Sequence, residues 1–79
     1  MTKHEDEYKI KIDKDVYEVN QKLITGSKIL ALAGLTSEEY DLRLKKKGGQ
    51  TLIGPNDQVD LSEPGIEKFV TFKKETSEG

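Results

Sequence analysis

Three stretches of the chain alternate apolar and polar residues with a period of two. They read YKIKID at residues 8–13, VYEVNQ at residues 16–21 and YDLRLKK at residues 40–46. This spacing sends successive side chains to opposite faces of a β-strand, so we predict three strands that each have one buried face. The polar turn Asp13-Lys14-Asp15 joins the first two strands into a predicted hairpin.

Residues 26–33, GSKILALA, carry the signals of a short helix. Thr25 is predicted to cap the first turn with its hydroxyl group. Gly34 suits the left-handed conformation that commonly ends a helix. The helix face that packs on the sheet is predicted to consist of its apolar residues, Ile29, Leu30, Leu32 and Ala33.

The second half of the chain contains shorter elements. Gly48-Gly49 interrupts the third strand, and QTLI at residues 50–53 predicts a short edge strand. Val59 and Leu61 form a small apolar pair in a segment predicted to be irregular and to end at Pro64-Gly65.

The last predicted strand, IEKFVTF at residues 66–72, is rich in β-branched and aromatic residues, with Phe69 and Phe72 on opposite faces. The element order is therefore strand, strand, helix, strand, short strand, strand. This order predicts an α+β domain in which a mixed sheet of four to five strands packs on one short helix. With the first and last strands parallel at its centre, the arrangement is the β-grasp, or ubiquitin-like, fold.

Composition narrows the possible functions. A chain of 79 residues forms one small domain that buries roughly 60% of its unfolded surface, which leaves little room for a large catalytic cleft. The net charge of −2 gives no case for nucleic acid as a partner. Cysteine is absent, and no apolar run reaches the length of a membrane span. We therefore expect a cytoplasmic protein without a membrane anchor.

Sequence patterns typical of catalytic or metal sites are weak. His4 stands alone in residues 1–7, which are predicted to be a disordered arm. Asp13 and Asp15 are better explained by turn formation, and Asp57, Asp60 and Glu63 lack the spacing of a calcium loop. We predict no enzyme activity, no metal site and no bound cofactor.

Two longer stretches resemble a known family. LITGSKILALAGL at residues 23–35 and YDLRLKKKGGQTLIGPNDQVDLSEPGIEKFVTF at residues 40–72 are similar to the bacterial multiubiquitin domain family. The similarity covers most of residues 8–72, the predicted domain. It implies a ubiquitin-like modifier that works with a ubiquitin-type activating enzyme, a conjugating enzyme and an isopeptidase, in systems associated with antiphage defence.

The resemblance gives a role to residues 73–79, KKETSEG, a predicted flexible tail. A carboxylate that is to react with ATP on a partner activating enzyme must reach out from its own domain, which favours extended, small and polar residues. Gly79 is the expected acyl donor that forms an isopeptide bond with a target protein, because glycine has no Cβ to clash where backbones approach closely. The residues presented to the activating enzyme would be Lys73, Lys74, Glu75, Thr76, Ser77 and Glu78.

Other interpretations of the tail remain open. Ubiquitin ends in a glycine pair, whereas Glu78 precedes Gly79 here. The channel through which the tail enters the activating enzyme would therefore need a different lining. Terminal residues are also commonly polar and disordered without any function. The domain could be a noncovalent binding module or one unit of a tandem array, in which Gly79 is a boundary, or a sulfur carrier that uses a C-terminal thiocarboxylate.

The outer sheet face is predicted to be mainly charged, whereas ubiquitin presents an apolar patch there. Its outward positions hold Lys9, Lys11, Glu18, Arg43 and Lys45, with Val70 and Phe72 as the apolar candidates. We expect partner enzymes to recognise charge on this face. The candidate partner-binding residues are Lys9, Lys11, Arg43, Lys45, Val70 and Phe72. The alternative is an ordinary solvated surface on which lysines protect the sheet edges.

Overall fold

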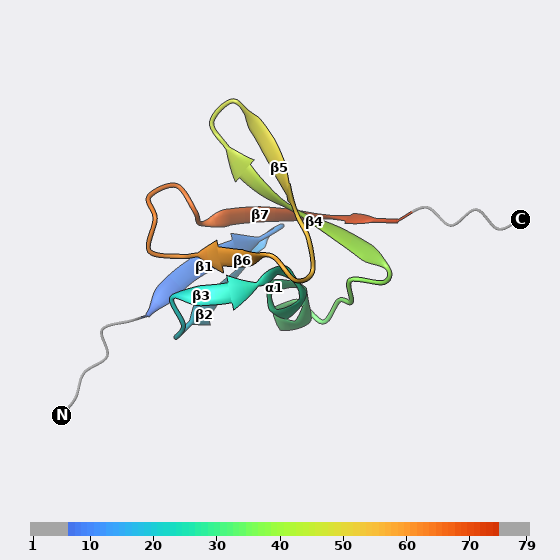
Figure 1. The fold of residues 1–79 in the computed structure, drawn as a ribbon, viewed down its shortest axis with the longest axis horizontal. Coiled ribbons are helices and arrows are strands. Elements are labelled where there is room, and N and C mark those ends of the chain that lie inside the picture. The colour runs from blue at the N-terminus through green and yellow to red at the C-terminus, as the bar shows by residue number, and fades with distance from the viewer. Residues whose placement is uncertain (1–6, 75–79) are drawn as a thin grey trace, which may run out of the picture.

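Seven strands and one helix follow one another along residues 7–74, the part of the chain that this computed structural model describes (Figure 1). Their bounds are β1 (Tyr8–Ile12), β2 (Asp15–Val19), β3 (Leu23–Thr25), α1 (Gly26–Leu32), β4 (Tyr40–Lys46), β5 (Gly49–Ile53), β6 (Gln58–Asp60) and β7 (Lys68–Lys73). His4, in the predicted N-terminal arm, lies outside the described residues.

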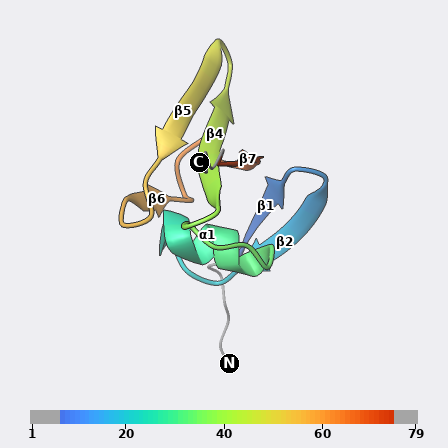
Figure 2. The same ribbon diagram turned by 90° about the vertical axis from the view of Figure 1, so that its right-hand side faces the viewer.

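Five strands form one mixed sheet in the order β2-β1-β7-β4-β5. β1 runs parallel to β7, and the other neighbours are antiparallel. The helix lies against one face of this sheet, while the β4–β5 hairpin projects away from it (Figure 2). The prediction of a β-grasp fold, with the first and last strands parallel at the centre, is confirmed.

The core lies between the sheet and the helix, where alternation along the strands places the apolar side chains. Ile10, Ile12 and Phe69 on the two central strands are each 1% exposed. The rest of the core consists of Val19, Ile24, Ile29, Leu30, Leu42, Leu44, Val59 and Leu61. Tyr8, Tyr17 and Tyr40 pack at its margin, half-buried.

Both helix ends match the predicted chemistry. The hydroxyl of Thr25 accepts a hydrogen bond from the N–H of Lys28 at 3.3 Å. At the other end, the N–H of Gly34 donates to the carbonyl of Ala31 and the N–H of Leu35 donates to the carbonyl of Leu30, both at 2.9 Å. With Gly34 at φ 77°, these two bonds form a Schellman motif, which satisfies carbonyls that the helix would otherwise leave unpaired.

The predicted helix face is wrong at one position. Ile29 and Leu30 are buried, but Leu32 is 39% exposed. The helix also ends at Leu32, one residue earlier than predicted, with Ala33 as its cap. Since each residue turns the helix by about 100°, Leu32 lies nearly opposite Leu30 and turns away from the sheet.

The segment around Val59, predicted to be irregular, contains the short strand β6. It pairs with β3 in a separate two-stranded antiparallel sheet, with Ile24 opposite Val59. Both side chains are 5% exposed, so this small sheet closes the core beside the helix. Each strand has three residues, too few for alternation to be recognisable in the sequence.

The helix begins directly on the loop that precedes β6. The N–H of Gly26 donates to the carbonyl of Asp57 at 3.1 Å, and the N–H of Ser27 donates to the carbonyl of Pro55 at 3.0 Å. A Cβ atom at residue 26 would lie 2.3 Å from the carbonyl oxygen of Gly54. Glycine is therefore required at this position by the close approach of two backbones.

Candidate functional site

The strand that leads to the C-terminal residues occupies the centre of the sheet. β7 pairs with β4 from Leu44 opposite Phe69 to Tyr40 opposite Lys73. On its other side it pairs with β1 through Lys68 and Phe69. This strand is therefore held on both sides at its start and on one side at its end.

The pairing extends past the boundary predicted for the tail. Lys73 is the last residue of β7, and the N–H of Lys74 donates to the carbonyl of Glu39 at 2.8 Å. The Lys74 ammonium nitrogen lies 3.8 Å from a carboxylate oxygen of Asp41, with both side chains about 40% exposed. The prediction that the free tail begins at Lys73 is therefore wrong, because Lys73 pairs with Tyr40 in β4 and Lys74 bonds to Glu39, just before β4. The other predicted tail residues, Glu75, Thr76, Ser77, Glu78 and Gly79, lie outside the described residues.

The six residues predicted to form a partner-binding surface share the outer face of the sheet. Lys9 and Lys11 lie between the buried residues of β1, so their side chains point away from the core. Arg43 and Lys45 alternate with buried Leu42 and Leu44 in the same way. Val70 is opposite Arg43 in the ladder, and Phe72 is opposite Asp41. The structure thus brings these residues onto one face, although they come from three strands.

This face is more apolar than predicted. Leu52 is directly opposite Arg43 on the other side from Val70, and it is 59% exposed. The guanidinium carbon of Arg43 lies 5.1 Å from the centre of the Phe72 ring, the geometry of a cation–π contact. We call Arg43, Leu52, Val70 and Phe72 the Arg43 cluster. Leu52 was missed because no face could be assigned to a short edge strand whose pairing was unknown.

The Arg43 side chain is unusually enclosed for a residue on an outer sheet face. Its Nε atom is buried and finds no hydrogen-bond partner among residues 7–74. An unpaired buried donor costs free energy, and the contact that the same side chain makes with the Phe72 ring acts in the opposite direction. The chemical character of the cluster is therefore an apolar surface with one cation at its centre.

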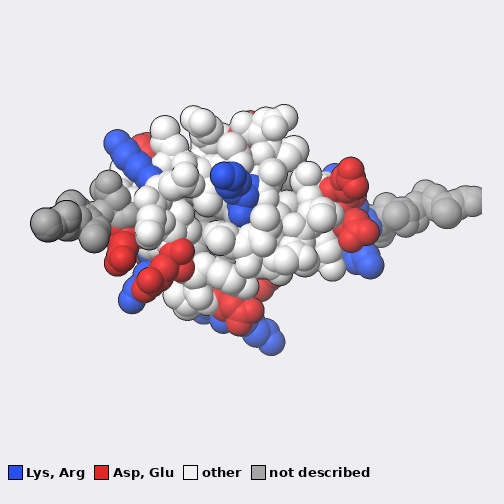
Figure 3. Space-filling model, turned by 90° about the horizontal axis from the view of Figure 1, so that it is seen from below, with Lys and Arg blue, Asp and Glu red and all other residues white. Residues whose placement is uncertain are grey.

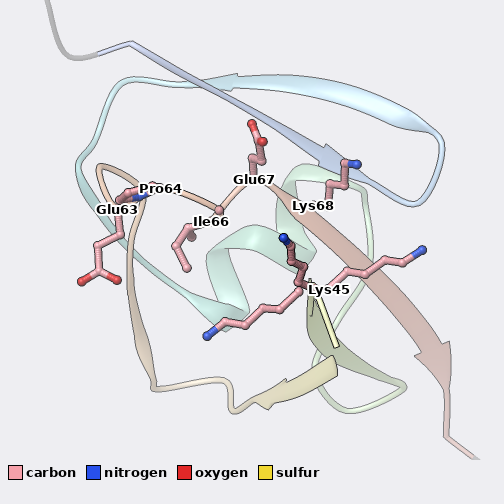
Figure 4. A pocket seen from close by; sticks show the side chains of 9 residues that line it. Lys45, Glu63, Pro64, Ile66, Glu67 and Lys68 are labelled. Atoms are coloured by element: carbon pink, nitrogen blue, oxygen red, sulfur yellow. The ribbon is translucent and has the colours of Figure 1, made fainter. Parts of the chain in front are cut away.

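Lysines gather at the other end of the same face. Lys68, which the sequence prediction did not include, is directly opposite Lys11 in the parallel ladder. Lys45 and Lys68 line a common hollow of about 570 Å³ together with Lys46, Lys47 and residues 63–67 (Figure 4). By contrast, the side on which the helix lies carries charges of both signs toward its margins, and a basic side chain stands in the middle of its mainly uncharged surface (Figure 3).

The acidic residues near the last turn play a local structural role. One carboxylate oxygen of Asp60 accepts hydrogen bonds from the Ser62 hydroxyl at 2.6 Å and the Ser62 N–H at 2.9 Å. These two bonds, the hydroxyl first, hold the pKa of Asp60 below its ordinary value. Within the described residues, no group of three His, Cys, Asp or Glu side chains is placed to hold a metal ion. No helix in this part of the chain is long and apolar enough to cross a membrane.

The comparison with protein families supplies the decisive observation. The model of the family described as Multiubiquitin matches residues 8–74, from the first residue of β1 to the residue after β7. The chain belongs to the multiubiquitin family. As a multiubiquitin domain it is a ubiquitin-like module, which confirms the resemblance seen in the sequence. The comparisons with curated proteins and with solved structures found no match.

Proposed function

We propose that this multiubiquitin domain is a bacterial ubiquitin-like modifier whose C-terminal carboxylate, at Gly79, is activated and then joined to amines of target proteins. Antiphage defence is the proposed setting. The observation that supports this function best is the position of β7. It runs through the centre of the sheet and ends at the side of the domain opposite the start of β1 (Figure 1), so the chain after Lys74 starts from an exposed position.

The proposed chemistry requires only an acyl group from this chain. The Gly79 carboxylate would attack the α-phosphate of ATP on the activating enzyme, which releases pyrophosphate. A cysteine thiolate would then displace AMP to give a thioester, and a target lysine amine would displace the thiol to form the isopeptide bond. Partner enzymes would supply every acid and base, and an isopeptidase would hydrolyse the isopeptide bond with water, which returns the free Gly79 carboxylate and the lysine amine.

The contacts of β7 set the reach of the proposed tail. Because Lys73 pairs with Tyr40 in β4 and Lys74 bonds to Glu39 just before that strand, the five residues from Glu75 to Gly79 would have to cross the channel of the activating enzyme. Fully extended, five residues span at most about 18 Å. We therefore expect the domain body, including Lys74 and Asp41 at the exit of the chain, to press against the mouth of that channel.

Reconstitution with the cognate activating and conjugating enzymes tests the proposal. The chain would be incubated with both enzymes, ATP and an acceptor protein, and the products digested with trypsin. Cleavage after Lys74 should leave Glu-Thr-Ser-Glu-Gly joined through Gly79 to an acceptor lysine, detected by mass spectrometry. Deletion of Gly79 is the matched control and should abolish the remnant. Absence of the remnant from the parent chain, together with full function of the deletion variant in cells, would refute conjugation.

The Arg43 cluster favours a second candidate function, noncovalent binding as a separate module or as a unit of a tandem array. An exposed apolar surface around one cation is a common feature of protein-binding faces. In that case Phe72→Ala would abolish partner binding while deletion of Gly79 would leave it unchanged. A thiocarboxylate at Gly79, visible in the intact mass, would instead assign the chain as a sulfur carrier.

A further inference from the structure

Three lysines stand side by side across the three inner strands of the sheet. Lys11 on β1 is directly opposite Lys68 on β7. Lys68 adjoins Lys45 on β4, since Phe69 and Leu44 are the next pair in the ladder. All three side chains are exposed on the outer face. We call Lys11, Lys68 and Lys45 the lysine row.

Protection of sheet edges does not explain the lysine row. Lysines guard edge strands against pairing with other chains, but β1, β7 and β4 are the inner strands, and the edges are β2 and β5. Like charges placed opposite each other also destabilise a sheet. Elsewhere on the same face the ladder combines opposite charges, with Lys9 opposite Glu18. The lysine row therefore carries a cost in stability that no structural role on the sheet offsets.

No carboxylate within the described part of the chain neutralises the row through an ion pair. The ion pair found among residues 7–74 joins Lys74 and Asp41, near the far end of β7. Glu67 borders the row beside Lys9 and Lys11, and Glu63 lies across the hollow from Lys68 in Figure 4. The row remains a surface with an excess of positive charge.

Lys45 and Lys68 of the row line the hollow of about 570 Å³, and Lys11 lies beside Lys68 just outside it. One wall of this hollow is formed by Pro64 and Ile66 in the turn before β7, and Ile66 is half-buried against the core. Lys46 and Lys47 extend the basic rim at the end of β4. The site therefore offers several ammonium groups next to a short apolar wall.

We propose that the lysine row and its hollow bind an acidic segment of a partner polypeptide. Neighbouring strands are about 4.8 Å apart, so the first and third lysines are about 10 Å apart at their Cα atoms. In a polyproline II segment, which has three residues per turn and a rise of about 3.1 Å per residue, carboxylates three residues apart lie on the same side, about 9 Å apart. An apolar residue between them would contact Pro64 and Ile66. This surface goes beyond the proposed function, because it can act whether or not Gly79 is conjugated.

The surroundings of the row favour a protein over a nucleic acid. A nucleic-acid strand presents a continuous line of phosphates and usually stacks its bases on aromatic rings. Here Glu63 and Glu67 interrupt the basic surface, and the hollow is lined by no aromatic side chain among the described residues. A peptide whose carboxylates are separated can bind the lysines without placing a negative charge beside Glu63 or Glu67. An apolar side chain between those carboxylates can contact Pro64 and Ile66.

Binding of a defined peptide tests this proposal. The probe is a fluorescein-labelled peptide of sequence SEVSEVSE, whose glutamates recur at every third position, and binding is followed by fluorescence anisotropy with the whole chain. The triple variant Lys11→Gln, Lys45→Gln, Lys68→Gln should bind about tenfold more weakly at moderate salt. The control Lys14→Gln, Lys22→Gln, Lys28→Gln removes the same charge from exposed positions elsewhere, and should change affinity by less than about twofold.

Two further measurements make the outcome decisive. The lysine-row variant should be at least as stable as the parent chain in chemical denaturation, because like-charge repulsion is relieved, so its loss of binding cannot be attributed to unfolding. A short single-stranded oligonucleotide should bind more weakly than the peptide. An equal loss of peptide affinity in both triple variants, or binding of the oligonucleotide more tightly than the peptide, would overturn the proposal. Neither result bears on the isopeptide remnant at Gly79, so the two proposals fail independently.

Discussion

The carboxylate of Asp13 binds Thr71 twice, across 58 positions of sequence. One oxygen accepts from the Thr71 N–H at 3.0 Å and the other from the Thr71 hydroxyl at 2.6 Å. Asp13 also donates its own N–H to the carbonyl of Phe69 at 2.9 Å. The parallel pairing of β1 and β7 ends at Ile12 and Phe69, so the Asp13 side chain continues that ladder. It holds the middle of the strand that leads to the proposed conjugation site.

Substitution of Asp13 should therefore loosen β7. Asp13→Asn removes the charge and one acceptor, and we expect a loss of about 1 kcal/mol in the free energy of unfolding. Asp13→Ala should cost about 1 kcal/mol more, because Asp13 has a φ of 59°, which alanine tolerates poorly. Chemical denaturation measures both, and hydrogen exchange at the Thr71 amide should accelerate. A double-mutant cycle with Thr71→Val that shows no coupling would contradict this role.

Gly26→Ala should be among the more destabilising single substitutions. The new methyl group would lie 2.3 Å from the backbone oxygen of Gly54, and the helix start cannot shift without losing its bonds to the 54–57 loop. We expect a loss of about 1 to 3 kcal/mol in the free energy of unfolding. Ser27→Ala, the adjacent and exposed helix position, should change stability by less than about 0.5 kcal/mol. Similar values for the two variants would show that the loop moves freely.

Leu30 and Leu32 provide a second matched pair, on opposite sides of the helix. Leu30 is 2% exposed and Leu32 is 39% exposed. Leu30→Ala should therefore cost about 2 to 5 kcal/mol, as buried large-to-small substitutions do, while Leu32→Ala should cost under about 1 kcal/mol. Thermal or urea denaturation compares them directly. A large effect of Leu32→Ala would mean that the helix packs on the sheet through a different face.

The Asp60 carboxylate should make the free energy of unfolding depend on pH under acidic conditions. Its pKa is lowered from 3.8, first by the Ser62 hydroxyl and then by the Ser62 N–H. A lowered pKa means that the folded state favours the ionised form, so this stabilisation is present above about pH 4 and is lost as the pH falls through the folded pKa. Ser62→Ala should raise the Asp60 pKa in a carboxyl-carbon NMR titration. The loss of stability caused by Ser62→Ala should become smaller below about pH 4. A loss that does not change with pH would refute the assignment of this pH dependence to Asp60.

Local chemistry in the sequence was sufficient to predict much of the fold. Alternation predicted the inward positions of Ile10, Ile12, Leu42 and Leu44, and the capping roles of Thr25 and Gly34 also proved correct. These signals depend on neighbours within a few residues. The strands β3 and β6 were missed because each is too short to show an alternating pattern of apolar and polar residues. They are recognised as strands by their pairing with each other.

The candidate site was less predictable because it depends on pairing between distant segments. Lys9, Lys11, Arg43 and Lys45 could be assigned to the outer face by alternation alone. That Lys68 lies opposite Lys11 follows from the parallel register of β1 and β7, which no local pattern specifies. The hydrogen bond of the Lys74 N–H likewise depends on Glu39 in a distant loop. The role of Gly79 remains a prediction.

The Arg43–Phe72 contact should contribute a measurable coupling on the outer face. The guanidinium carbon lies 5.1 Å from the ring centre, a contact worth about 0.5 to 1 kcal/mol at an exposed site. We expect that coupling from a double-mutant cycle of Arg43→Met and Phe72→Leu, measured by urea denaturation. Arg43→Met alone should cost little, because it also removes a buried Nε that finds no partner among residues 7–74. A coupling near zero would show that Arg43 fills space beside the ring without a specific attraction, and would make the cluster a purely apolar surface.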